Sequence, residues 1–216
     1  MKNITHLRPC TRLSALGIPG LMLLCGPALA HHPMGGRTPS NFLEGMLSGL
    51  GHPIIGIDHF AFLVAVGLLA MGQAHRLLIP AAFVLMTVVG TLAHVAGIDL
   101  ASVEATVAVS VLLAGGLLLA DRRHHAGLIG LLAAAAGLFH GYAYGESIVG
   151  AESTPLFAYL AGFSLIQYCV AVTVTWCGER FLRSASAALA GKLTRTAGVA
   201  ICAVGAVYLG LALYAA

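Results

Sequence analysis

Long apolar runs alternate with short polar connectors along most of the chain. A helix needs about 20 apolar residues to cross the hydrocarbon layer of a membrane, and each run is close to that length. The runs fall at about 53–71, 77–97, 103–120, 126–148, 155–178 and 195–214. Because the connectors are too short to form another domain, the pattern predicts an all-α fold, a polytopic membrane bundle of six transmembrane helices.

The first 30 residues have the pattern of a secretory signal peptide. Lys2, Arg8 and Arg12 form a basic start, and an apolar stretch covers 13–25. Ala28 and Ala30 then mark a small-residue cleavage site. Cleavage after Ala30 would leave 31–216 as one six-helix transmembrane domain. An uncleaved anchor is the alternative; Pro19 interrupts the apolar stretch and Pro27 follows it, which favours cleavage.

Charged residues orient the predicted helices in the membrane. Apart from Arg37, the basic residues after the leader lie in alternate connectors: Arg76, Arg122, Arg123, Arg180, Arg183, Lys192 and Arg195. The other connectors carry Asp99, Glu104 and Glu152 and no basic residue. Since basic connectors stay in the cytoplasm, we expect a multi-pass protein of the bacterial inner membrane. Both ends of the mature chain would then face the periplasm.

The composition excludes several classes of protein. Only 9% of the residues are charged and 59% are apolar, against about 25% and 45–50% in soluble domains. A soluble enzyme and a disordered chain do not fit these values. A net charge of +3 is too small for a nucleic-acid-binding surface. The five cysteines show no disulfide pattern, and those near the apolar runs are expected to pack as small hydrophobic side chains.

Polar side chains interrupt the first, second and fourth runs, where a charge costs about 2.5–3.5 kcal/mol to insert. In chain order they are His52, Asp58, His59, His94, His140 and Glu146. At about 1.5 Å per residue, all three runs place these residues in the outer half of the membrane. His52 and His59 are seven residues apart and share a helical face. Random scatter would not favour one half, so we expect a single site.

Small residues are expected to hold this site inside the bundle. A stripe that permits close helix contact follows the fourth run: Gly130, Gly137, Gly141 and Gly145. Pro53 and Gly56 are expected to loosen the first turn of the first run and expose backbone carbonyls. Ser164 and Gln167 in the fifth run either support the site or make interhelical contacts. The inner half has few polar groups, so the pattern does not explain an exit route.

Imidazole and carboxylate groups together suit Ni, Co, Zn, Cu or Fe(II). Each residue also has a simpler interpretation. His94 could make a hydrogen bond between helices, Glu146 could lie at the membrane interface, and Asp58 could orient an imidazole instead of binding the ion. His31 and His32 would begin the mature chain, where a free amine and imidazole bind metal, or they form a leader without a role.

At these residues the sequence resembles the HupE/UreJ family of nickel or cobalt permeases. The resemblance covers essentially the whole mature chain and rests on three features. The first is the cleaved signal with its His-rich mature start. The others are the blocks His52-x5-Asp58-His59 and Phe139-His140-Gly141-x-Ala143-x-Gly145, with Glu146 directly after the second. It implies a transporter, not an enzyme, that moves Ni(II) or Co(II) from periplasm to cytoplasm for hydrogenase, urease or cobalamin pathways. The metal-pathway residues carried over from the resemblance are His52, Asp58, His59, His140 and Glu146. We add His94, His31 and His32 from their depth and position.

The sequence also limits how such a permease would work. It has no nucleotide-binding loop, so we expect no direct ATP drive within this chain, and nothing in the sequence indicates an ATPase partner. The inside-negative potential favours entry of a cation by about 2.3 kcal/mol per charge per 100 mV. The metal would be cargo, with no permanently bound cofactor, and a homo-oligomer is left open. Two alternatives remain: an intramembrane zinc-dependent hydrolase with Glu146 as general base, and a non-transporting metal-sensing membrane subunit.

Histidine coordination predicts that uptake depends on pH. A free imidazole has a pKa of about 6.5, and a protonated ring cannot bind metal. Uptake of Ni(II) or Co(II) into vesicles should therefore fall as the pH drops below about 6.5. The measurement is the initial rate of uptake between about pH 7.5 and 5.5, and a flat profile would count against histidine ligands.

Overall fold

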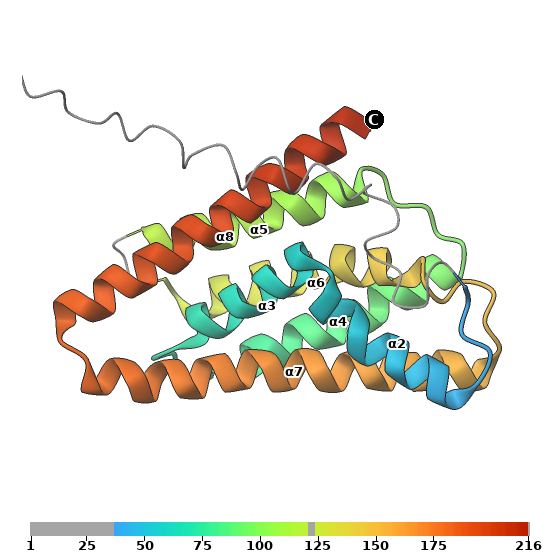
Figure 1. The fold of residues 1–216 in the computed structure, drawn as a ribbon, viewed down its shortest axis with the longest axis horizontal. Coiled ribbons are helices and arrows are strands. Elements are labelled where there is room, and N and C mark those ends of the chain that lie inside the picture. Colours follow the sequence, from blue (N-terminus) through green and yellow to red (C-terminus); the bar gives the residue numbers. More distant parts are fainter. Residues whose placement is uncertain (1–36, 121–123, 216) are drawn as a thin grey trace, which may run out of the picture.

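The computed structural model describes residues 37–120 and 124–215 (Figure 1). Within these residues the chain forms helices and no strand. The helices are α2 (Phe42–Ile55), α3 (Ile57–Ala70), α4 (Leu78–Val95), α5 (Val103–Leu119), α6 (Ala126–Gly145), α7 (Ser153–Ser184) and α8 (Ala187–Ala215). The predicted signal peptide, His31, His32, Arg122 and Arg123 lie outside the described residues.

The protein is a multi-pass membrane protein, although the predicted number of six spans is not confirmed. Four described helices are long and apolar enough to cross a membrane: α4, α6, α7 and α8. The pair α2 and α3 passes the same test together as one broken span. Helix α5 coincides with the predicted third run, but with 17 residues it is a shorter apolar helix. The described helices therefore supply four to five candidate spans.

The first predicted run is wrong at its start. Helix α2 begins at Phe42, well before residue 53, because Asn41 caps it by accepting a hydrogen bond from the backbone N–H of Glu44. Pro53 lies inside α2, and the break comes at Gly56, where the axis turns by 76° into α3. The sequence predicted that Pro53 and Gly56 would loosen this part of the helix, and the structure breaks the helix at Gly56.

The last predicted connector is also wrong, because it is almost entirely helical. Helix α7 continues through Arg180 and Arg183, and α8 begins at Ala187, before Lys192 and Arg195. Long basic side chains can extend along a helix toward the membrane surface, so these charges do not end either helix. Arg183 and Arg76 both pair with Glu179 at this end of the bundle.

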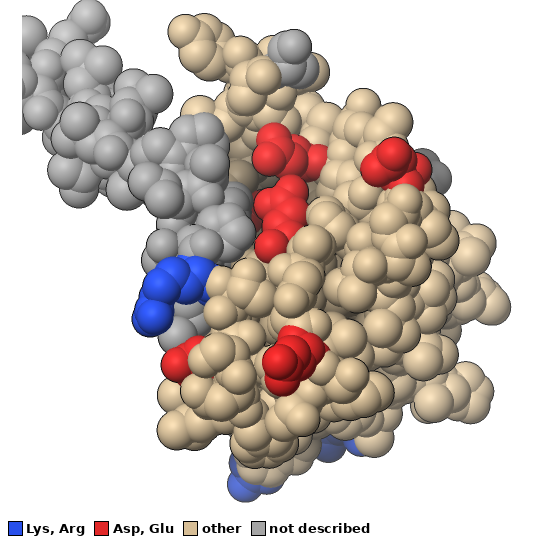
Figure 2. Space-filling view, turned by 90° about the vertical axis from the view of Figure 1, so that its right-hand side faces the viewer, with Lys and Arg blue, Asp and Glu red and all other residues tan. Residues whose placement is uncertain are grey.

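Charge separates the two ends of the molecule, as the sequence predicted. Arg76, Arg180 and Arg183 lie where α3 and α7 end and α4 begins; we call this the basic end. Glu44, Glu146 and Glu152 lie where α2 and α7 begin and α6 ends. Figure 2 looks onto this acidic end and shows several acidic side chains spread over it. The segregation confirms that the basic connectors lie at one end of the bundle and the acidic ones at the other.

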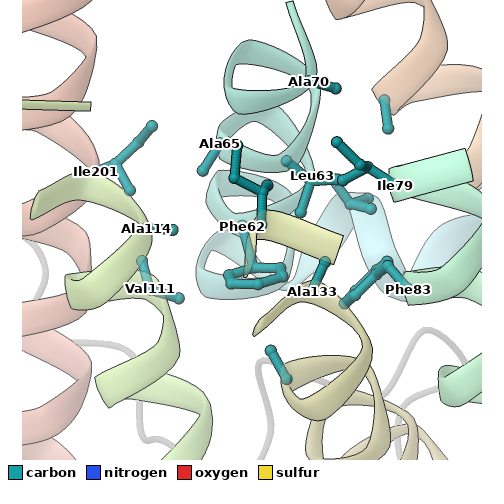
Figure 3. Close-up of a cluster of buried hydrophobic side chains, with 14 of the residues drawn as sticks. Phe62, Leu63, Ala65, Ala70, Ile79, Phe83, Val111, Ala114, Ala133 and Ile201 are labelled. Carbon is teal, nitrogen blue, oxygen red and sulfur yellow. The ribbon is translucent and has the colours of Figure 1, made fainter. Parts of the chain in front are cut away.

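Helix α3 is the centre of the bundle and contacts all six other described helices. Phe62, Leu63 and Val66 on it are buried. Figure 3 shows Phe62 and Leu63 between Phe83 and Ile79 of α4 on one side and residues of α5 and α8 on the other. The polar residues at the start of α3 are therefore held inside a tightly packed apolar core.

Glycines bring the outer helices into backbone contact with one another. A Cβ atom on Gly141 of α6 would overlap the carbonyl oxygen of Thr87 on α4, and Gly90 of α4 meets Leu138 of α6 in the same way. Gly49 joins α2 to α7 at Tyr159, and Gly115 joins α5 to α8 at Cys202. The predicted stripe on α6 is confirmed at Gly137, Gly141 and Gly145, which all contact α4.

The predicted stripe is wrong at Gly130, where an added Cβ atom would meet nothing within 4 Å. This difference supplies a matched pair of substitutions on one helix. Gly141→Ala should destabilise the protein by about 1–3 kcal/mol, because α4 and α6 must move apart. Gly130→Ala should be neutral or stabilise by up to about 1 kcal/mol, because alanine is the better helix former. Thermal unfolding in detergent measures both, and equal midpoints would contradict this packing.

Candidate functional site

Three histidines from three helices meet inside the bundle. His52 lies near the end of α2, His59 in the first turn of α3 and His140 in α6, and all are at most 2% exposed. Ring nitrogen Nδ1 of His59 is 2.9 Å from Nδ1 of His140, and the ring centroids of His52 and His59 are 5.8 Å apart. These residues are called the histidine cluster below.

The break between α2 and α3 brings His52 and His59 together. On one straight helix their seven-residue spacing would separate them by roughly 10 Å along the axis. The 76° bend at Gly56 folds α2 back toward the start of α3, so the two rings approach more closely. The sequence predicted a common face of one helix for these two residues; in the structure they lie close together but on two helices.

Hydrogen bonds determine where His140 carries its proton. The hydroxyl of Ser110 on α5 donates to the carbonyl of Val107 at 2.6 Å. Its oxygen must therefore accept the bond from Nε2 of His140 at 2.9 Å. With its proton on Nε2, neutral His140 has its lone pair on Nδ1, so His59 donates its Nδ1 proton to His140. The order of donation is His59, His140, Ser110 and the Val107 carbonyl.

A second chain of hydrogen bonds orients His52. Tyr159 on α7 donates its hydroxyl proton to the carbonyl of Tyr144 at 2.9 Å. The Tyr159 oxygen then accepts the bond from Nδ1 of His52, also at 2.9 Å. Ser147 lies 3.1 Å from the same nitrogen. The neutral His52 ring therefore has its lone pair on Nε2, and the direction of that ring is fixed by α7.

Tyr144 fills the space beside two of the histidine rings. It is fully buried on α6, and its ring centroid lies 4.8 Å from that of His52 and 4.6 Å from that of His59, edge-on in both cases. Tyr144 follows His140 by four residues, so the two share a helical face, and this spacing could have revealed it in the sequence. The sequence carries no comparable signal for Ser110 or Tyr159, because their partners are distant in the chain.

Asp58 is buried next to His59 in the first turn of α3, with 5% of its surface exposed. The positive end of a helix dipole stabilises an anion at this position. Because α3 begins at the break, that positive end lies inside the bundle instead of at the membrane surface. The broken helix therefore supports a buried carboxylate directly beside the histidine cluster.

The other predicted site residues lie outside the cluster. His94 on α4 is half-buried, and its Nδ1 is 2.9 Å from the carbonyl oxygen of Tyr142 on α6. This is the contact between helices that the sequence left as its alternative role. Glu146 is exposed just after α6, at the acidic end. Within the described ranges, no three side chains of His, Cys, Asp or Glu converge to hold a metal ion.

Comparisons with known proteins agree with the pattern of residues. A sequence model of the HupE / UreJ protein family matches residues 20–208 of the chain. The chain is 30% identical over 191 residues to Protein HupE of Rhizobium leguminosarum bv. viciae. The aligned region covers 88% of this chain and 94% of that protein. No solved structure matches the chain significantly.

The hydrogen-bond chains predict which nitrogen of each ring carries the proton. In the neutral rings, His140 should be protonated at Nε2 and His52 at Nδ1, because Ser110 and Tyr159 accept from those atoms. Nitrogen-15 NMR of protein labelled at histidine measures this near neutral pH, with single histidine substitutions for assignment. Tyr159→Phe should redistribute the proton of His52 and leave His140 unchanged. A proton on Nδ1 of His140 would contradict the assignment.

Proposed function

Since the chain belongs to the HupE / UreJ family, we propose that it is a membrane permease for a divalent transition metal. Ni(II) is the first candidate cargo and Co(II) the second. The ion would move from the periplasm to the cytoplasm, where it would supply metalloenzyme or cobalamin maturation. The protein would lie in the bacterial inner membrane with both mature ends in the periplasm. We propose no resident cofactor and no ATPase partner.

The observation that carries the proposal is the close pair of ring nitrogens. Nδ1 of His59 and Nδ1 of His140 are 2.9 Å apart. Two nitrogens that bind one ion at about 2.0–2.1 Å and at a right angle lie about 2.9 Å apart. A divalent cation that takes the place of the shared proton would require both rings to turn until their lone pairs converge on it, with the His59 proton moving to Nε2, and the pair would then act as two adjacent ligands.

The surroundings of the pair are those of metal-binding histidines. A ligating imidazole commonly donates its second N–H to a nearby oxygen, which fixes the ring and raises its basicity. Ser110 has this relation to His140, and Tyr159 has it to His52, which would bind through Nε2. Asp58 would supply negative charge, which offsets the cost of a dication in a low-dielectric interior.

The acidic end would act as the entrance. Acidic side chains gathered over one face attract cations and raise their local concentration. Glu146 is exposed there, directly after the helix that carries His140. We propose that Glu146 and His94 receive the ion near this surface and that His31 and His32 capture it first. The membrane potential, negative inside, then favours movement toward the basic end.

Uptake into proteoliposomes tests the proposal directly. Purified protein in phosphatidylethanolamine–phosphatidylglycerol vesicles, with an internal metal-sensitive fluorophore, should admit Ni(II) or Co(II). His59→Ala removes one nitrogen of the pair, and Asp58→Ala removes the neighbouring charge. We expect each to reduce the initial rate by roughly 10–100-fold, the range seen when groups around a metal site are lost. His75→Gln, an exposed histidine between α3 and α4, is the matched control and should keep the parental rate.

Other outcomes would point to different functions. Metal binding without uptake by intact, correctly inserted protein would support a sensor subunit. Hydrolysis of lipid that requires added zinc would support the intramembrane hydrolase. Equal losses in His75→Gln and His59→Ala would show that the cluster has no special role.

A further inference from the structure

Tyr144 on α6 is fixed at its backbone by the hydrogen bonds that orient His52. Its carbonyl oxygen accepts the hydroxyl proton of Tyr159 at 2.9 Å, and the Tyr159 oxygen accepts from His52. The Tyr144 ring then lies edge-on against both His52 and His59, with ring centroids 4.8 and 4.6 Å away. The group that holds the far end of this ring therefore also acts on the two imidazoles.

Gln167 on α7 holds the hydroxyl end of the Tyr144 ring. Gln167 is fully buried, and its side-chain amide is hydrogen-bonded to the Tyr144 hydroxyl. On its other side, Oε1 of Gln167 lies 3.0 Å from the hydroxyl of Thr87 on α4. A buried amide costs several kcal/mol in hydrocarbon without such partners. Gln167 therefore connects α4 to the residue that lies beside the histidine rings.

The protons of this chain follow from the number that each group can donate. The Thr87 hydroxyl has one proton and two acceptors, the carbonyl oxygen of Val84 at 2.7 Å and Oε1 of Gln167 at 3.0 Å. The oxygen and nitrogen of an amide exchange places when it turns by 180°. After this turn, Nε2 of Gln167 donates to Thr87, whose own proton goes to Val84. Oε1 then accepts the proton of Tyr144, so that each side chain in the chain has a partner.

This chain of hydrogen bonds is the third one at the histidine cluster. The chain from His59 ends on a backbone carbonyl of α5 and the chain from His52 on one of α6, whereas the chain from Tyr144 ends on α4. The ring of Tyr144 could fill its space without a hydroxyl, which must be hydrogen-bonded to be buried. The hydroxyl therefore matters for what it fixes, which is the orientation of the ring.

We propose that Gln167 is a positioning residue of the metal site, which acts through Tyr144 on the imidazoles of His52 and His59. This inference rests on the proposed function. The imidazoles must turn to bind one ion, and a Tyr144 ring that is held at both ends limits the directions in which they turn. Fewer arrangements then have to be given up when the ion binds, which raises the affinity. The contact of Gln167 between helices is thus also support for the site.

Three variants and a control separate positioning from simple stabilisation. Gln167→Leu removes the amide at similar volume, Tyr144→Phe removes only the hydroxyl, and the double variant removes both partners. Thr91→Val on α4 is the matched control, because its buried hydroxyl donates to the Gly141 carbonyl at 2.7 Å, a bond between helices that does not involve Tyr144. Each protein is compared with the parent in detergent for Ni(II) affinity, by titration calorimetry, and for the midpoint of thermal unfolding.

We expect Gln167→Leu and Tyr144→Phe each to weaken Ni(II) binding roughly tenfold, near the lower end of the range for groups that support metal ligands. Each should also unfold at a lower temperature, because one buried polar partner is left unpaired. In the double variant both partners are apolar, so the thermal midpoint should rise again, whereas the affinity should stay about tenfold below that of the parent. Thr91→Val should keep the parental affinity.

Three results would overturn this role of Gln167 and leave the permease intact. The first is parental affinity in Gln167→Leu. The second is an affinity that recovers together with the thermal midpoint in the double variant, because Gln167 would then act only through stability. The third is losses of affinity that add in the double variant, because Gln167 would then not act through Tyr144. Ni(II) binding without uptake by the parent would overturn the permease alone, and no Ni(II) binding by the parent would overturn both.

Discussion

The hydrogen bond between the ring nitrogens of His59 and His140 is the interaction around which the bundle is organised. It joins α3, which contacts every other described helix, to α6. Both rings are excluded from solvent, so each needs the other or a further polar partner. Ser110 on α5 is the further partner of His140, and Tyr159 on α7 is the partner of the neighbouring His52 on α2. Polar groups that would be costly in hydrocarbon thus connect five helices.

Close backbone packing makes this arrangement rigid. Gly141 follows His140 directly and lies against the backbone of Thr87, and Gly145 lies against His94. A helix that can slide or rotate would separate nitrogens that are now 2.9 Å apart. The glycines on α6 therefore serve the site as well as the fold. The break at Gly56 contributes in a different way, because it starts a new helix beside the buried Asp58.

Much of this could be predicted from sequence, because a membrane interior makes polar residues conspicuous. His52, His59, His140 and Asp58 interrupt apolar runs, and all four prove to be buried close together. The start of α2 at Phe42 was missed because its first turns are too polar to read as part of a span. Ser110, Tyr144 and Tyr159 were also missed as supporting residues, since serine and tyrosine are common in membrane helices. Their importance depends on which helices pack together, and local pattern does not carry that information.

Gln167 shows the same limit for a residue that the sequence did single out. Its sequence context allows either support for the site or an ordinary interhelical contact. In the structure its Oε1 lies 3.0 Å from the hydroxyl of Thr87 on α4, so it makes a contact between helices. Three-dimensional context also accounts for His94, whose bond to the Tyr142 carbonyl could not be foreseen from a single histidine in an apolar run.

The central claim is that the histidine cluster binds the transported ion, and X-ray absorption spectroscopy of Ni(II)-loaded protein tests it most directly. The spectrum reports the atoms bound to nickel, and imidazole ligands give a characteristic scattering pattern. We expect at least two imidazole nitrogens in the parent protein and a loss of imidazole scattering in His59→Ala. A shell of oxygen atoms alone, unchanged by that substitution, would contradict the account.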